Sequence, residues 1–160
     1  MSKNITKRRF SRKQKKQVKQ TNKKNNRNKS VRIKDNKKSH IVHIFLEMLN
    51  IIKLYHWKTK SYAQHKATDE LHGRLSENID KFVEVLLGKD ESRIRMIEKE
   101  IELMDFSDTM SFKEKMYEYR DFLTNLDRYF SERTDSDLFS IRDDILADVN
   151  QFLYLMTFDK

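Results

Sequence analysis

Two histidines and three acidic residues recur at spacings that suit a metal ion. They are His56, His65, Asp69, Asp80 and Glu84. In a helix that turns by about 100° per residue, the three acids share one stripe, and His65 joins that side if the helix begins there. Divalent iron and manganese favour carboxylate oxygens combined with some imidazole. The five residues are therefore candidate metal ligands, and such a shell leaves a position open for oxygen or peroxide.

Each of these residues also has a purely structural interpretation. The acids could form the solvated face of an amphipathic helix, and His56 could be a boundary histidine with a satisfied hydrogen bond. His72 follows Asp69 by three residues and could replace an imidazole ligand, although packing is the simpler role. Asp144 and Asp148 have no histidine at the spacing of a ferritin-like pair, so we interpret them as exposed charge.

Four helices are expected to position these residues. Apolar residues recur at three- and four-residue steps, which predicts amphipathic helices over about 39–58, 65–87, 111–131 and 135–156. Ser39 is a candidate N-cap, Gly88 a candidate stop, and Ser111 to Glu114 has the pattern of a capping box. Residues 89–106 are either a helical piece or a long crossover. The sequence predicts an all-α four-helix bundle over residues 39–160, with one longer connection.

Composition excludes several other classes of protein. The 160 residues include no Pro, no Cys and only two Gly, which argues against a hairpin-rich β fold, disulfides and thiolate metal sites. The N-terminus has no apolar stretch of signal-peptide length, and every apolar run is too short to span a membrane. We expect an intracellular protein that is neither secreted nor bound to a membrane.

The net charge of +9 conceals two oppositely charged parts. Residues 1–40 hold 17 basic side chains and one acid, a net charge of +16, whereas residues 41–160 hold 17 basic and 24 acidic side chains, a net charge of −7. The apolar residues of the first part follow no helical or strand period. Such a segment buries too little apolar surface to offset the entropy of ordering. Residues 1–38 are therefore predicted to be a disordered basic tail.

Nucleic acid is the partner that such a tail predicts, because lysines and arginines bind a phosphate backbone by releasing its counterions. This binding would be salt-sensitive and non-specific, with DNA the expected form. The candidate nucleic-acid-binding residues are Lys7, Arg8, Arg9, Arg12, Lys13, Lys15, Lys16, Lys19, Lys23 and Lys24. The same stretch could instead be a nuclear localisation signal, or it could lie on the acidic body of a neighbouring copy.

The region around the histidines resembles a known family. Residues 53–57 read Lys-Leu-Tyr-His-Trp. They are followed by His65, Asp69, Asp80 and Glu84, with gaps of four, eleven and four residues between them. This pattern resembles the mini-ferritins, the Dps-like branch of the ferritin superfamily. The resemblance covers about residues 45–88. The sequence Tyr-His-Trp-Lys-Thr-Lys-Ser-Tyr-Ala at 55–63 is closer still to an uncharacterised family of phage and large-DNA-virus proteins.

The resemblance implies a ferritin-like bundle that binds iron and oxidises it, as a ferroxidase does. It implies a homodimer or larger homo-oligomer, in which His56, His65 and Asp69 come from one subunit while Asp80 and Glu84 come from another. Several mini-ferritins also bind DNA through basic tails. The sequence departs from the family pattern in one spacing, which concerns the role of His56 as a ligand. His56 precedes His65 by nine residues, where the family usually has twelve.

A second function fits the same residues. The chain could be a non-enzymatic nucleic-acid-binding or virion structural protein on a ferritin-like scaffold that has lost its metal site. The shortened connection favours this alternative, and a viral origin would place the protein in a virion or in the host nucleus or cytoplasm.

Overall fold

Four α-helices make up most of the part of the chain that the structure, a computed structural model, describes, residues 34–158. They are α2 (Asp35–Lys58), α3 (Tyr62–Gly88), α4 (Thr109–Thr124) and α5 (Glu132–Leu155), and a short 3-10 helix, η1 (Asn125–Arg128), follows α4. The prediction of an all-α fold with four helices is confirmed. The candidate nucleic-acid-binding residues and nearly all of the predicted tail lie outside residues 34–158.

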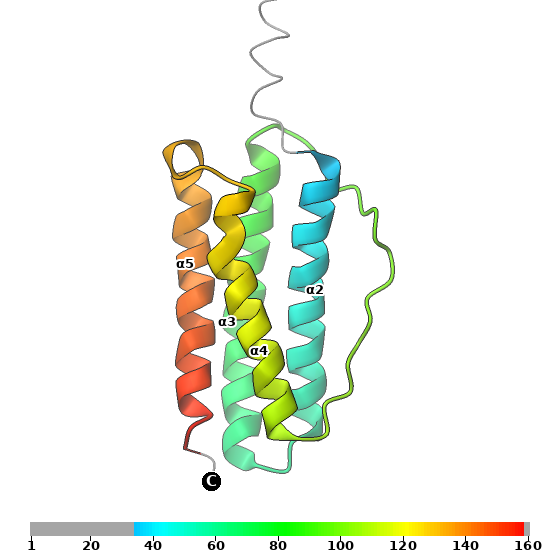
Figure 1. The fold of residues 1–160 in the computed structure, drawn as a ribbon, viewed down its shortest axis with the longest axis vertical. Helices are drawn as coiled ribbons and strands as arrows, with labels where there is room; N and C mark the ends of the chain where they lie inside the picture. The colour runs from blue at the N-terminus through cyan, green and yellow to red at the C-terminus, as the bar shows by residue number, and fades with distance from the viewer. Residues whose placement is uncertain (1–33, 159–160) are drawn as a thin grey trace, which may run out of the picture. The chain divides into compact units, whose positions relative to one another are not determined.

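The helices form two antiparallel hairpins joined by a long connection (Figure 1). Residues 59–61 link α2 to α3, while residues 89–108 return along the outer side of α2 before α4 begins. Because of this return, α3 and α4 run in the same direction. Helix α3 packs against both α2 and α5, and α4 packs against α5.

The core is built from the apolar stripes of all four helices. Its largest fully buried side chains include Phe45 of α2, Phe82 of α3, Phe112 of α4 and Phe152 of α5. Phe45 meets Phe82 edge to face with ring centroids 5.3 Å apart, and Phe112 meets Phe152 in the same manner at 6.0 Å. Burying each ring stabilises the fold by roughly 2–3 kcal/mol.

The bundle begins earlier than expected. Helix α2 starts at Asp35 rather than at Ser39, and both Lys38 and Ser39 are buried. The Lys38 ammonium lies 2.8 Å from the Asp90 carboxylate and donates to the Ser92 hydroxyl at 2.7 Å. The predicted border between tail and bundle, at residues 38 and 39, therefore falls inside α2. Lys38 resembles the lysines of the basic tail in sequence, but it forms an ion pair within the bundle.

The cap of α4 differs from the predicted capping box. Asp108 is the N-cap, and its carboxylate accepts the Ser111 backbone N–H at 2.9 Å and the Ser111 hydroxyl at 2.8 Å. Ser111 thus lies inside the helix as a donor, and the assignment of Ser111 as the cap is wrong. Helix α4 also ends at Thr124 rather than near residue 131, since the chain tightens there into η1.

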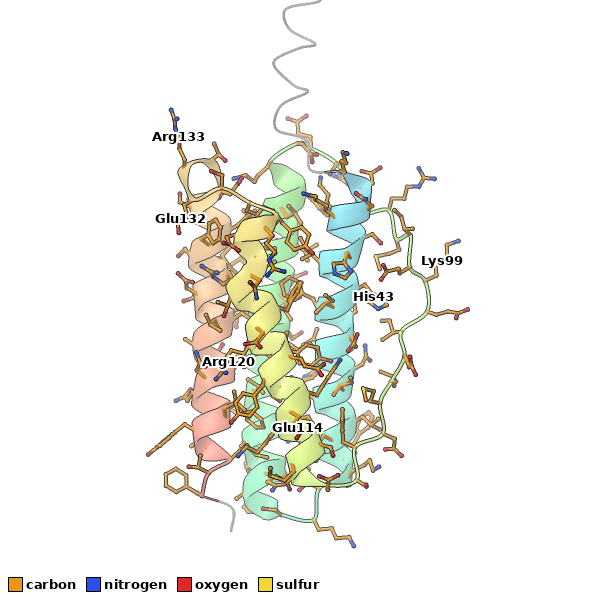
Figure 2. The ribbon with its side chains drawn as sticks, in the orientation of Figure 1. His43, Lys99, Glu114, Arg120, Glu132 and Arg133 are labelled. Atoms are coloured by element: carbon orange, nitrogen blue, oxygen red, sulfur yellow. The ribbon has the colours of Figure 1, made fainter. Side chains whose placement is uncertain are left out.

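Residues 89–106 form the long crossover and contain no helix. A turn follows Gly88, where α3 ends as predicted, and Glu91 adopts a positive φ of 54°. Further along, the Ile97 N–H donates to the Ser39 hydroxyl at 2.8 Å, and Lys58 pairs with Asp105. Figure 2 shows His43 of α2 directed toward this crossover, where its Nδ1 lies 3.5 Å from the Glu98 carboxylate.

Candidate metal centre

Two histidines are locked together at the turn between α2 and α3. His56 Nδ1 lies 2.9 Å from the His65 carbonyl oxygen, and His65 Nδ1 lies 3.0 Å from the His56 carbonyl oxygen. The rings stack with centroids 3.9 Å apart. The connection is tight because Ser61 caps α3 by accepting the Gln64 N–H, so α3 begins three residues before His65. The short spacing of nine residues therefore still brings the two imidazoles into contact.

The hydrogen bonds fix which nitrogen of each ring is available. A carbonyl oxygen can only accept, so Nδ1 of both His56 and His65 carries the proton. In the neutral rings, Nε2 then keeps its lone pair. Metal-binding histidines are commonly oriented in this way, with one ring nitrogen donating to a backbone carbonyl and the other binding the ion. The Thr68 hydroxyl, 3.3 Å from His56 Nδ1, adds a second polar contact on the same side of the ring.

Asp69 lies beside this pair, one turn after His65 on α3. One carboxylate oxygen is 3.8 Å from His56 Nε2, and the side chain is 53% exposed. The same oxygen is 3.4 Å from the Lys53 ammonium, which also lies 5.8 Å from the centre of the Trp57 ring. The hydrogen bond from Lys53 lowers the pKa of the Asp69 carboxyl. The structure therefore brings His56 into contact with His65 and within 3.8 Å of Asp69, and it favours the ionised form of the Asp69 carboxyl.

Asp80 and Glu84 are exposed on the same helix but do not reach this cluster. Asp80 follows Asp69 by eleven residues, about 16 Å along the helix axis. Within residues 34–158 of a single chain, no three His, Asp or Glu side chains stand close enough to hold a metal ion. A shell that contains all five residues would need a second chain.

Other residues near the stripe have structural partners. His72 is half-buried on α3, and burial together with the positive charge of Lys53 lowers its pKa. Asp148 of α5 is only 15% exposed and pairs with Arg74 at 3.3 Å. The prediction that Asp148 is exposed charge is wrong, because a partner from another helix covers it. Lys53 was not predicted to be a neighbour of Asp69, although it lies three residues before His56 and thus on the same face of α2.

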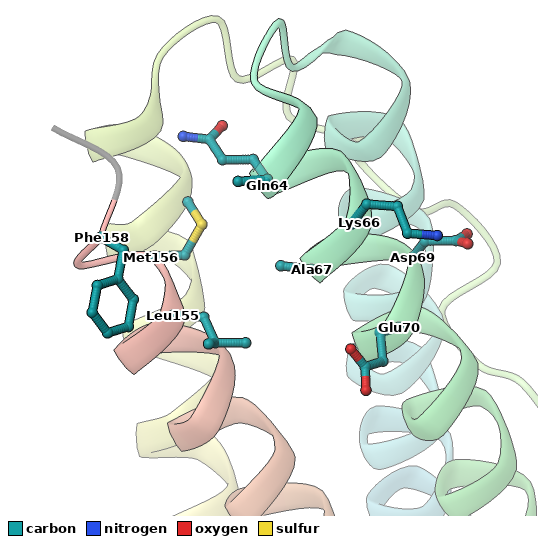
Figure 3. A pocket seen from close by; sticks show the side chains of 9 residues that line it. Gln64, Lys66, Ala67, Asp69, Glu70, Leu155, Met156 and Phe158 are labelled. Atoms are coloured by element: carbon teal, nitrogen blue, oxygen red, sulfur yellow. The ribbon is translucent and has the colours of Figure 1, made fainter.

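Two surface hollows adjoin α3. One, of about 480 Å³, lies between the first turns of α3 and the end of α5. Figure 3 shows Leu155 at the end of α5 and the following Met156 lining it opposite Ala67, while Lys66 and Asp69 point away from α5. Apolar residues of α3 and of the C-terminal end of the chain make up the rest of its lining, together with Gln64 and Glu70.

The second hollow is a groove of about 690 Å³ on the outer face of α2 and α3. Helix α2 contributes apolar side chains, and α3 contributes small and charged residues of the acidic stripe. The residues that line it include Leu46, Leu49, His72, Gly73, Ser76, Glu77, Asp80 and Val83. The candidate ligand Asp80 thus lies at the edge of an open, partly apolar surface.

No helix within residues 34–158 is long and apolar enough to cross a membrane. Among known proteins, a family of unknown function (DUF5856) matches residues 56–156, from His56 to the end of α5. No curated protein and no solved structure matches the chain. The matched region contains all five candidate ligands, while the resemblance to mini-ferritins remains an expectation.

Proposed function

The chain belongs to this family of unknown function (DUF5856), and we propose that it binds Fe(II) at a site shared between two subunits. One subunit supplies His56, His65 and Asp69, and the other supplies Asp80 and Glu84. The observation that carries the proposal is the reciprocal bonding of the two imidazoles. It leaves both Nε2 lone pairs available, and that of His56 lies beside the exposed carboxylate of Asp69.

The donor set suits iron better than softer or harder ions. Two imidazole nitrogens and three carboxylates form the mixed shell that Fe(II) accepts, whereas Mg²⁺ and Ca²⁺ prefer oxygen ligands throughout. The chain has no cysteine, so it cannot form the thiolate sites that select Zn²⁺ or Cu⁺. The resemblance to mini-ferritins extends the proposal to oxidation of the bound Fe(II) by peroxide or oxygen.

A shared site explains the exposure of the acids. Asp69, Asp80 and Glu84 are exposed on one stripe of α3 that faces away from the core, where side chains of a second copy could reach them. Asp80 and Glu84 lie one turn apart, and two carboxylates at this spacing repel one another until a cation binds between them. The arrangement supports a half-site that is completed, and neutralised, when a second chain and a metal ion arrive.

Subunit complementation tests this proposal. Asp69→Ala and Asp80→Ala should each abolish tight binding of Co(II), an air-stable substitute for Fe(II), followed by its d–d absorption. Mixing the two variants should restore binding, because one site of each mixed dimer then contains both native aspartates. Asp144→Ala, which removes an exposed acid of α5, should bind like the wild type. Failure of mixing to restore any binding, with mixed dimers present, would contradict a shared site.

The charge distribution supports a second candidate function, non-specific binding of nucleic acid. Residues 1–40 carry a net charge of +16, and the rest of the chain carries −7, so a polyanion would be bound by the N-terminal part alone. This function needs no metal site.

Charge neutralisation of the N-terminal segment tests this function without removing it. Replacing the ten candidate residues between Lys7 and Lys24 by Gln should weaken binding to duplex DNA and flatten its dependence on salt. Lys38 should be kept in this variant because it is buried in the bundle. Affinity that is unchanged at moderate salt would refute the assignment of these residues.

A further inference from the structure

Two further histidines of α2 face the long crossover. His40 and His43 are one helical turn apart, and His43 lies about 20 Å along the helix from His56. Each oxygen of the Glu98 carboxylate lies near one of the two rings: Oε1 is 3.9 Å from His40 Nδ1, and Oε2 is 3.5 Å from His43 Nδ1. Both distances exceed that of a hydrogen bond. A carboxylate of the crossover is thus within ion-pair distance of two imidazoles without being bonded to either.

A second carboxylate flanks His43. Its Nε2 lies 4.0 Å from one oxygen of Glu47, while the other Glu47 oxygen pairs with Lys115 and accepts the Tyr119 hydroxyl. His43 is only 15% exposed, and its buried Nδ1 has no hydrogen-bond partner within residues 34–158. A neutral imidazole has one donor and one acceptor nitrogen, so one of them must present a lone pair to a carboxylate. Only the protonated ring can donate to Glu47 and Glu98 together.

The crossover has few other attachments at this point. Ion pairs hold both of its ends. Over residues 93–104, the described part of the chain shows a single hydrogen bond to the bundle, from the Ile97 N–H to the Ser39 hydroxyl. Glu98 follows Ile97 directly and lies at the middle of the crossover, so its contacts decide how firmly this part is held.

We propose that His40 and His43 form a proton-operated clasp with Glu98, which fastens the middle of the crossover to α2 at mildly acidic pH. Histidine side chains gain their charge in this range, and each imidazolium then attracts the Glu98 carboxylate. As the pH rises, the rings become neutral, the attraction is lost and the middle of the crossover loosens. By linkage, the protons and the closed crossover stabilise one another. The inference goes beyond the proposed function and does not depend on a metal or a nucleic acid.

The charges contributed by α4 leave this clasp intact. Lys115 is the cation that opposes a proton on His43, but its ammonium already pairs with Glu47 at 2.8 Å and with Glu118 at 3.0 Å. Burial and the hydrogen bond to Glu47 raise the pKa of Tyr119, so this residue stays neutral. Two carboxylates therefore face His43, against one cation whose charge is already compensated.

A spin label on the crossover tests the clasp. The chain has no cysteine, so a nitroxide can be attached through Lys99→Cys alone, next to Glu98. Figure 2 shows Lys99 directed away from the bundle, where a label disturbs no packing. We expect the rotational correlation time of the nitroxide, measured by electron paramagnetic resonance, to lengthen by about twofold or more between pH 7.5 and pH 5.5.

Variants of the labelled protein identify the groups responsible. Glu98→Gln removes the carboxylate from both rings and should abolish the pH response without affecting the bundle. Glu100→Gln, at an exposed acid of the same crossover with no ion pair within residues 34–158, should keep it. Combined His40→Gln and His43→Gln should leave the label mobile at both pH values. A pH response that persists in Glu98→Gln, or its absence from the protein that carries only the label, would overturn the clasp.

Discussion

At the scale of single residues, His56 and His65 fix each other's orientation. Each imidazole holds the backbone of the other through a hydrogen bond of 2.9 or 3.0 Å. Their ring orientation is therefore set before any ion arrives, and this preorganisation lowers the cost of binding. A metal ion would compete with the Lys53 ammonium for Asp69, because the two side chains already form an ion pair.

Replacing Lys53 by Met should therefore strengthen metal binding. The change removes the cation that a metal must displace, and it also lets the pKa of Asp69 return toward its usual value. We expect Co(II) affinity at pH 7 to rise several-fold in an absorption titration. Lys66→Met, which removes a positive charge near Asp69 without breaking that hydrogen bond, should have a smaller effect. Equal or weaker binding by the Lys53 variant would show that the ammonium does not compete for the carboxylate.

At the scale of elements, the helices are anchored by polar contacts at their ends. Two of these contacts were not predicted: the Asp108 cap of α4 and the buried pairing of Lys38 with Asp90. Both fix the long crossover, since Asp108 ends it and Asp90 begins it. The path of this segment thus depends on a few side chains rather than on regular secondary structure.

Removal of the α4 cap should destabilise the protein in a pH-dependent way. Asp108→Ala leaves the first N–H groups of α4 without their acceptor and should lower Tm by about 3 °C at pH 7. Hydrogen bonds from Ser111 lower the pKa of Asp108, so the stabilisation is present at neutral pH and is lost as the pH falls through that lowered pKa. Calorimetry at pH 7 and at pH 2.5 should thus give a smaller difference at the acid pH. A larger effect of Ser111→Ala would favour the capping box instead.

Loss of Lys38 should release the start of the crossover. Lys38→Met removes the ammonium that lies 2.8 Å from the mostly buried Asp90 carboxylate, and loss of such a partner is costly for a buried charge. Burial raises the pKa of Asp90, but hydrogen bonds from Lys38 and Ser92 outweigh it and keep the net pKa low. We expect amide hydrogen exchange in residues 89–97 to accelerate by roughly tenfold or more. Lys37→Met, on the exposed neighbouring position, should leave exchange unchanged.

The sequence predicted the four helices because their apolar residues follow the helical period over many turns. The same rule was ambiguous for residues 89–106, where Ile94, Ile97 and Ile101 step by three and four yet lie in an extended segment. Their spacing could not distinguish a helix from an extended segment. In the structure Ile94 and Ile97 are exposed rather than packed on a core face. For the site, spacing along α3 identified the stripe, while the pairing of His65 with His56 depended on where α3 begins.

At the scale of the whole molecule, metal binding and dimer formation should be coupled. A metal ion that bridges Asp69 and the partner's Asp80 removes a repulsion across the interface, so by linkage it must tighten the dimer. We expect saturating Co(II) to shift the monomer–dimer equilibrium toward the dimer in sedimentation velocity. Asp80→Asn should keep the metal-free dimer but lose this shift. A monomer–dimer equilibrium that Co(II) leaves unchanged would show that dimer formation does not depend on metal binding.

The central claim is that His56, His65 and Asp69 of one subunit share an iron ion with Asp80 and Glu84 of another. An anaerobic Fe(II) titration of the wild type beside Asp80→Ala, followed by addition of peroxide, tests it most directly. We predict saturable binding and rapid oxidation in the wild type, both lost in the variant and both retained in Asp144→Ala. Binding that is equal in the wild type and in Asp80→Ala would contradict the shared site and leave nucleic-acid binding as the better account.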